Sequence, residues 1–305
     1  RLGISRQAVH HRMQVLTQIG VIKGMVASIS VSYLDAVPVA ISGPSRTASV
    51  EKALDRLGES ELTRRAVVCG GNYIYIVGFL RNISELEGYV EFVKQAAELP
   101  EPTVGIYCLD DELMPYYSVD GGGRRRQTQR PSALSTLDLR IISALKDNAR
   151  RPIAEIAKLL GVSAKTVRRH LEDMMAEGSL EFHLPADLAA GGDMFLLMQV
   201  TMREGANKRE VGKKLLSRYP FQDAYVRTHS NLPNLLVWVF WSDDINEIRR
   251  AVREVGEDKD VVAVMLNFAY IERIYETWRE NLLKGQAAPC GSFRTHDAGS
   301  GHRKN

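Results

Sequence analysis

Basic and hydroxyl side chains follow two copies of one turn, Leu-Gly-x-Ser, at residues 2–5 and 160–163. In both copies the Ser can cap a helix whose apolar residues share one face and leave the cations on the other. Such side chains can contact DNA phosphates and base edges. The predicted DNA-contacting residues are Ser5, Arg6, Gln7, His10 and Arg12 in the first copy, and Ser163, Lys165, Thr166, Arg168 and Arg169 in the second.

A basic helix face has a simpler explanation, because charged side chains are usually just solvated. For one isolated helix that explanation is the better one. Here the same face recurs after the same turn, and Arg1, Arg6, Arg12 and Lys23 all precede the first acid of the chain, Asp35. We therefore predict that both helices bind DNA.

The two segments belong to a longer internal repeat. Residues 2–22 align with residues 160–180 at an offset of 158, and residues 82–86 align with 244–248 at an offset of 162. A repeat of this length indicates that one structural unit occurs twice. The second copy starts near Leu134, so we expect a tandem duplication whose first copy lacks its opening segment.

The second copy carries a complete helix–turn–helix pattern. Apolar residues at helical spacing predict helices over residues 137–145 and 153–160. Gly161 then turns the chain, and Ser163 caps a third helix that runs to about residue 176 with Val167, Leu171 and Met174 buried. In the first copy the corresponding buried residues are Val9, Met13 and Leu16. The capped helix of such a motif fits the DNA major groove.

Each copy then changes to strand periodicity. After a linking strand over residues 25–31, the first copy predicts strands 37–42, 62–69, 73–80 and 103–109 and helices 48–57 and 84–97. The second copy predicts strands 195–202, 222–228, 235–241 and 261–268 and helices 208–218 and 246–255. This order is βαββαβ, a ferredoxin-like unit whose helices cover one face of the sheet. The other face needs a partner, either the second copy in this chain or another chain.

The order helix–turn–helix, linking strand and βαββαβ, present twice, resembles the Lrp/AsnC (feast/famine) family of transcription regulators. Residues 137–163 resemble the DNA-binding signature of that family. The resemblance implies a prokaryotic regulator that binds double-stranded DNA and self-associates through its α/β domains, which are called RAM domains. It also implies a small effector, often an amino acid, near Gly71, Asn72 and Tyr73, although Ile74 stands where the family tends to have Asp. A plain hairpin turn explains the same residues.

The predicted fold class is α+β, with two winged or helix–turn–helix domains alternating with two βαββαβ ferredoxin-like, RAM-type domains. The residues between the copies and at the end of the chain are Gly-rich, charged and aperiodic, so we expect a linker and a disordered tail. The predicted helix–turn–helix domains are 1–30 and 134–184, the α/β domains are 36–117 and 193–284, the linker is 118–133 and the tail is 285–305.

Composition and motif searches favour binding over catalysis. The 305 residues, of which 45% are hydrophobic and 25% charged, are typical of a globular protein with two or more domains. Three distant cysteines fit a reducing cytoplasm, and no run of about 18 apolar residues predicts a membrane span. No His or Cys pair has metal-ligand spacing, and no nucleophile–base motif is readable. We expect no cofactor, no enzyme activity and a nucleoid-associated protein.

Two alternative functions come from other classes. Siroheme decarboxylases resemble Lrp/AsnC proteins in both domains and act on tetrapyrroles, so an enzyme of that kind is possible on fold alone. It would need cationic and histidine side chains in the α/β cleft, where the sequence offers only His183 and His229. The third alternative is a metabolite-binding module that has lost DNA binding.

Overall fold

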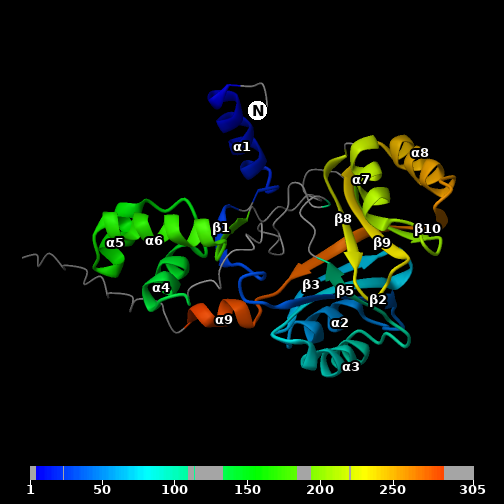
Figure 1. The fold of residues 1–305 in the computed structure, drawn as a ribbon, viewed down its shortest axis with the longest axis horizontal. Coiled ribbons are helices and arrows are strands. Elements are labelled where there is room, and N and C mark those ends of the chain that lie inside the picture. Colours follow the sequence, from blue (N-terminus) through cyan, green and yellow to red (C-terminus); the bar gives the residue numbers. More distant parts are fainter. Residues whose placement is uncertain are drawn as a thin grey trace, which may run out of the picture.

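The computed structural model describes residues 5–22, 24–108, 113, 133–183, 194–219 and 221–284. A helical part lies beside a larger part made of two sheets with their helices (Figure 1). The predicted tail, and the predicted linker except residue 133, lie outside the described residues. No described helix combines the length and the apolar character needed to span a membrane.

The helical part contains the predicted helix–turn–helix of the second copy. Ser135 and Asp138 form a capping box at the start of α4 (Thr136–Leu145). Helix α5 (Ile153–Leu160) ends at Gly161, whose φ of 70° is a left-handed conformation that glycine adopts without strain. Ser163 then caps α6 (Ala164–Glu177), which leads into strand β6 (Leu180–His183). The buried core of this unit includes the predicted Val167 and Met174, while Leu171 is half-buried.

Strand β6 pairs antiparallel with β1 (Val26–Ile29), so that Ala27 faces Phe182. These two strands follow the third helix of the second unit and the one described helix of the first unit, respectively. Their pairing therefore joins the segment that follows α1 to the segment that follows α6 through a two-stranded sheet.

Helix α1 (Arg6–Gln18) begins as predicted, since the Ser5 side chain accepts a hydrogen bond from the Ala8 amide. The predicted buried stripe is wrong. Val9 and Met13 are only half-buried, and Leu16 is 36% exposed. The reason is that no described helix packs closely against α1, whereas α4 and α5 both pack against α6.

Both α/β units have the predicted order of elements. The first unit consists of β2 (Val37–Pro44), α2 (Val50–Leu57), β3 (Thr63–Cys69), β4 (Tyr73–Leu80), α3 (Leu86–Ala96) and β5 (Thr103–Cys108). The second unit consists of β7 (Met194–Met202), α7 (Lys208–Arg218), β8 (Gln222–His229), β9 (Leu235–Ser242), α8 (Ile245–Gly256) and β10 (Val261–Ile274). The strand orders β5-β2-β4-β3 and β8-β9-β7-β10 are those of a ferredoxin-like sheet.

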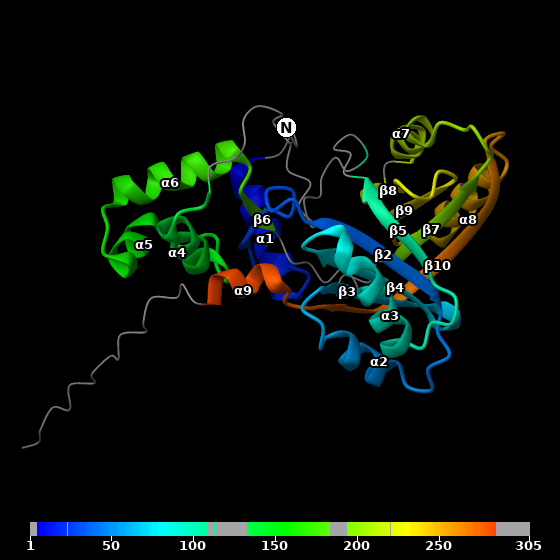
Figure 2. The same cartoon turned by 60° about the horizontal axis from the view of Figure 1, so that its bottom comes forward.

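The two sheets pack face to face and close on each other at both edges. Strand β10 is longer than the predicted 261–268, and its extra residues pair with β3 of the first unit. At the opposite edge β5 pairs with β8, with Tyr107 facing His229. Helices α2 and α3 cover one outer face, and α7 and α8 cover the other (Figure 2). Of the two partners expected for the open faces, the structure therefore has the copy in the same chain.

A short helix that the sequence analysis missed, α9 (Trp278–Lys284), follows β10. Its seven residues are too few for a clear periodic signal. Trp278 is part of the core between the sheets, and Leu283 is part of the helical core. Helix α9 therefore contacts both parts of the molecule.

Candidate DNA interface and inter-sheet pocket

Helix α6 places three of its predicted contact residues in solvent and uses two to begin the helix. Lys165, Arg168 and Arg169 are exposed. The Ser163 hydroxyl accepts a hydrogen bond from the Thr166 amide at 3.0 Å, and the two hydroxyls lie 2.9 Å apart. The cap fixes where the helix starts, and the cations project from its first two turns.

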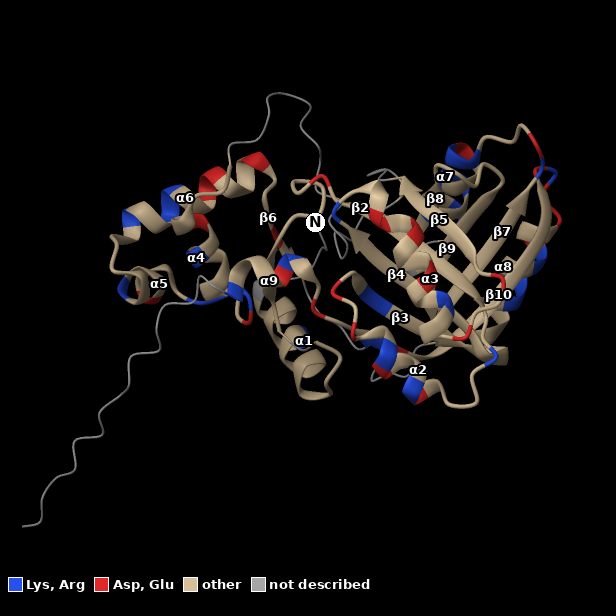
Figure 3. Ribbon diagram, turned by 90° about the horizontal axis from the view of Figure 1, so that it is seen from below, with Lys and Arg blue, Asp and Glu red and all other residues tan. Residues whose placement is uncertain are grey.

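The charges of α6 run against its dipole. The three cations occupy its N-terminal half, and Glu172, Asp173 and Glu177 occupy its C-terminal half (Figure 3). A helix is stabilised by acids near its N-terminus and by cations near its C-terminus. The distribution therefore does not stabilise the isolated helix, and it leaves a positively charged surface at the N-terminal end of α6.

Contacts with α4 and with the helical core fix the position of α6. His170 Nδ1 lies 2.7 Å from Asp138 Oδ1 on α4, and Val167 is fully buried. Burial opposes ionisation of Asp138, but hydrogen bonds from Ser135 and His170 outweigh it and lower the pKa of the carboxyl. The ionised Asp138 thus ties the middle of α6 to the start of α4.

Helix α1 offers a similar outer face with less support. Gln7, His10 and Arg12 are exposed, and Ser5 is used as the cap. The side chain of Arg6 lies outside the described residues. The paired strands β1 and β6 connect the segment that follows α1 to the segment that follows α6 (Figure 1).

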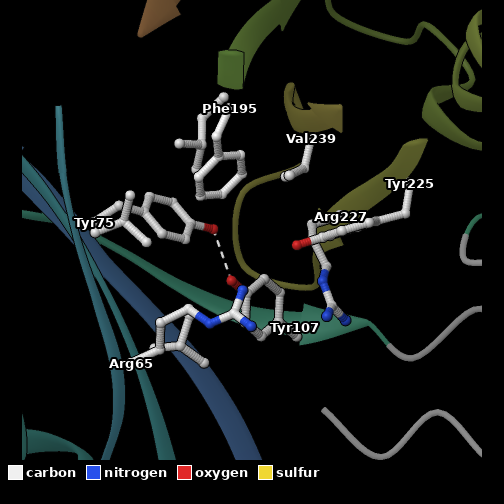
Figure 4. A pocket seen from close by; sticks show the side chains of 10 residues that line it. Arg65, Tyr75, Tyr107, Phe195, Tyr225, Arg227 and Val239 are labelled. Atoms are coloured by element: carbon white, nitrogen blue, oxygen red, sulfur yellow. Dashed lines mark hydrogen bonds between the residues drawn. The ribbon is translucent and has the colours of Figure 1, made fainter. Parts of the chain in front are cut away.

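A second candidate site lies between the two sheets. The space between the side chains is narrow, because a water-sized molecule finds a volume of only about 10 Å³ there, which is room for about one water. Arg65 on β3 and Arg227 on β8 reach it from opposite sides (Figure 4). Aromatic and aliphatic side chains complete the lining: Val67, Tyr75, Val77, Tyr107, Phe195, Leu197, Tyr225 and Val239.

The polar groups of this pocket contact one another. The hydroxyls of Tyr75 and Tyr107 lie 2.7 Å apart, and burial, together with the Tyr107 hydroxyl, raises the pKa of Tyr75. The Arg227 guanidinium lies 5.0 Å from the ring centres of both Tyr107 and Tyr225, within cation–π range. Arg65 Nε lies 3.1 Å from Glu272. These cations and hydroxyls are groups that can bind carboxylates.

His229 lies beside the pocket and is 2% exposed. Its ring stacks on Tyr107 at 5.2 Å, and it fits only because residue 105 is a glycine, since a β-carbon there would lie 2.2 Å from the imidazole. Burial, with help from Lys208 and Arg227, lowers its pKa to about 4, so the ring is neutral near pH 7.

Of these residues, His229 was named from the sequence under the enzyme alternative, whereas Arg65 and Arg227 were not predicted. The alternation of Tyr225, Arg227 and His229 along β8 is a usable signal, because alternate residues share one face of a strand. For Arg65 no such signal exists, since Arg64 and Arg65 are adjacent and either could face inward.

The predicted effector residues lie in the β3–β4 hairpin and do not line the pocket. Gly71 and Asn72 are exposed, with left-handed φ values of 69° and 57°. The Tyr73 hydroxyl donates to Ser42 at 3.1 Å and accepts from Gln199 of the opposite sheet at 2.7 Å. In this hairpin, turn geometry and an inter-sheet hydrogen bond account for the three residues.

Comparisons with known proteins identify one domain and one fold. Residues 134–180 match the family model described as winged helix-turn-helix DNA-binding. Over 89 residues, which are 28% of this chain, the sequence is 32% identical to an uncharacterized HTH-type transcriptional regulator, PH1916, of Pyrococcus horikoshii. The chain spans 59% of the length of that relative.

Among solved structures, the siroheme decarboxylase NirDL is similar with a TM-score of 0.60 and 16% identity, over 93% of this chain and 90% of that one. AsnC of E. coli has a TM-score of 0.39 and 17% identity, over 47% of this chain and 97% of its own. At 16% identity the likeness to NirDL shows a common fold and nothing about activity. The match over α4, α5, α6 and the start of β6 is the more specific finding, and residues 134–180 are a winged helix–turn–helix DNA-binding domain.

Proposed function

We propose that this protein is a sequence-specific regulator of transcription that binds double-stranded DNA. The observation that carries the proposal is the capped, cationic start of α6 inside a winged helix–turn–helix domain. In this motif the N-terminal half of the recognition helix enters the major groove. Lys165, Arg168 and Arg169 then contact phosphates and base edges, and Ser163 and Thr166 lie at the same helix start.

Helix α1 is proposed to be a second DNA-contacting helix that binds DNA more weakly than α6. Ser5, Arg6, Gln7, His10 and Arg12 are its contact residues. The pairing of β1 with β6 supports the idea that one chain presents two such helices to DNA. The repeated element order likewise supports a tandem duplication with the domain boundaries given above, and self-association through the α/β units remains part of the proposal.

Fluorescence anisotropy with a random-sequence 40-bp duplex tests DNA binding. Binding at low salt must weaken steeply as salt rises, because phosphate contacts release counterions. Absence of binding at low salt would rule out the regulator. Selection of bound fragments from genomic DNA then gives the operator.

The effector is proposed to be a small molecule, and the amino-acid site at Gly71, Asn72 and Tyr73 is one place for it. Isothermal titration with the twenty amino acids tests this site. A Gly71→Val variant provides the control, because a β-branched residue does not tolerate the left-handed conformation found there.

A second candidate function is tetrapyrrole chemistry, and the types of side chain between the two sheets favour it. A tetrapyrrole would require the two sheets to move apart, because the space between them admits about one water molecule. Arg227 and Arg65, of which Arg65 already pairs with Glu272, are the cations that would bind carboxylates, and His229 stacks on Tyr107 of the same lining. The likeness to NirDL covers both sheets. Titration with iron-uroporphyrin III should shift the absorbance of the ligand if the candidate is correct, and Arg227→Gln should abolish the shift. No spectral change would remove the enzyme and leave the regulator untouched.

A further inference from the structure

Helix α9 joins the DNA-binding part to the closed sheet. On the sheet side, the Trp278 indole donates a hydrogen bond to the Phe79 carbonyl at 2.8 Å, and its amide donates to the Glu61 carbonyl at 2.9 Å. On the helical side, Leu283 is 3% exposed and packs in the core that contains Ile29 of β1. One helix of two turns thus has an apolar anchor in each part.

Arg279 lies between these two anchors and is 1% exposed. Its Nη1 donates to the Ile29 carbonyl at 3.2 Å, and its Nε and Nη2 donate to Glu280 at 3.1 and 2.9 Å. The guanidinium also lies 5.4 Å from the ring centre of Phe79 on β4. A buried cation needs such partners, because the cost of removing it from water is large. Here those partners lie on α9, β1 and β4.

Glu280, the carboxylate partner of Arg279, has further polar partners of its own. Glu280 Oε2 accepts from the amide and the hydroxyl of Thr277 at 2.8 and 2.7 Å. Arg64 of β3 lies 3.9 Å from Glu280 Oε1 and donates to the Tyr275 carbonyl at 3.0 Å. Burial would raise the pKa of Glu280, but Arg279 and Arg64 lower it to about 2. The ion pair is therefore complete at neutral pH.

We propose that Arg279 is a positioning residue that fixes β1, and with it β6 and the helix–turn–helix part, in one orientation on the closed sheet. The inference rests on the proposed function for its meaning, because orientation matters when two DNA-contacting helices must meet one duplex. Its physical content is independent of DNA: without Arg279 the paired strands β1 and β6 loosen while both sheets stay intact.

Hydrogen exchange of the full chain tests this directly. In Arg279→Met, which keeps the length of the side chain but has no donors, we expect the amides of β1 and β6 to exchange at least tenfold faster. The amides of β4 and β9 should be unchanged. Arg273→Met is the matched control. Arg273 is 36% exposed, and its partners Glu51 and Asp55 lie on α2, away from α9 and β1. Faster exchange in every strand, or in none, would overturn the proposal.

A second pair of variants covers the case in which Arg279→Met does not fold. Leu283→Ala removes the anchor in the helical core, and Leu282→Ala alters a neighbour that is 42% exposed. Only Leu283→Ala should speed exchange in β1 and β6. Equal effects of the two variants would contradict the proposal that α9 holds the helix–turn–helix part against the closed sheet.

Binding to the random 40-bp duplex separates positioning from direct contact. Arg279→Met should weaken binding about threefold at one salt concentration, while the slope against salt stays the same because no phosphate contact is lost. A shallower slope would make Arg279 a DNA contact and would overturn the inference. If the unaltered protein does not bind DNA at all, the proposed function fails. The exchange experiment still decides whether Arg279 fixes β1 and β6 on the closed sheet.

Discussion

Helices α1 and α6 have related sequences and different surroundings. Each begins at a Ser that caps the third following amide, and each carries basic residues behind that cap. Leu16 of α1 is 36% exposed, whereas the corresponding Met174 of α6 is 2% exposed. A helix and its outer charges therefore follow from local sequence, whereas burial of its apolar stripe depends on neighbouring helices.

The largest predicted difference concerns these two apolar side chains. Met174→Ala should lower the free energy of unfolding of the helix–turn–helix part by about 2–5 kcal/mol, because it leaves a cavity in a packed core. Leu16→Ala should change it by less than about 0.5 kcal/mol, as is usual on a surface. Urea denaturation followed by circular dichroism measures both. Equal losses would mean that α1 is packed in solution.

The second difference concerns DNA. Removing two cations of α6 with Arg168→Ala and Arg169→Ala together should lower affinity about tenfold and reduce the salt slope by about two. Arg12→Ala in α1 should reduce the slope by about one at most. Anisotropy titrations between low and high salt give the slopes, and thermal unfolding checks that neither variant is unstable. An unchanged slope for the double variant would make the face of α6 a merely solvated one.

The third test compares the caps. Ser163→Ala should destabilise the helix–turn–helix part by about 1 kcal/mol, the usual cost of a lost N-cap. Ser5→Ala removes the same bond, but α1 is not part of the packed core, so the main unfolding transition should not move. Differential scanning calorimetry distinguishes the two results. If Ser5→Ala shifts the main unfolding transition, α1 unfolds cooperatively with the packed core, contrary to this prediction.

The smallest effect is a dependence on pH. Because the folded pKa of Asp138 is lowered, its contribution to stability is present above its ordinary value of 3.8 and is lost as the pH falls through the folded pKa. Acid should therefore loosen α6 from α4, and α1, which has no such carboxylate, should show no matching step. Urea midpoints at pH 5 and pH 3 measure the loss, and Asp138→Asn should remove this part of the pH dependence. If Asp138→Asn loses as much stability between pH 5 and pH 3 as the unaltered protein, the loss comes from other carboxylates.

Much of the fold was predictable from the sequence. The two βαββαβ orders, the turn at Gly161 and the caps at Ser5 and Ser163 were all predicted, since period, turn chemistry and caps are local features. Three features were not predictable: the exposure of Leu16, the extension of β10 to Ile274 and helix α9. Each depends on what packs against the segment.

The candidate sites divide in the same way. The cations of α6 could be found because helical spacing alone separates its two faces. Arg65, Arg227 and Tyr75 meet only because two sheets from distant parts of the chain close on each other, which no local pattern encodes.

The sequence by itself determined the order of the helices and strands in both α/β units, the caps that begin α1 and α6, and the charges that these two helices carry outward. The tertiary structure decided which of those faces are covered, that the closing partner of each sheet lies in the same chain, and that Arg279 lies between the two parts. The physical reason is range: caps, turns and periodicity act over a few residues, whereas burial and ion pairing depend on groups brought together by the whole fold.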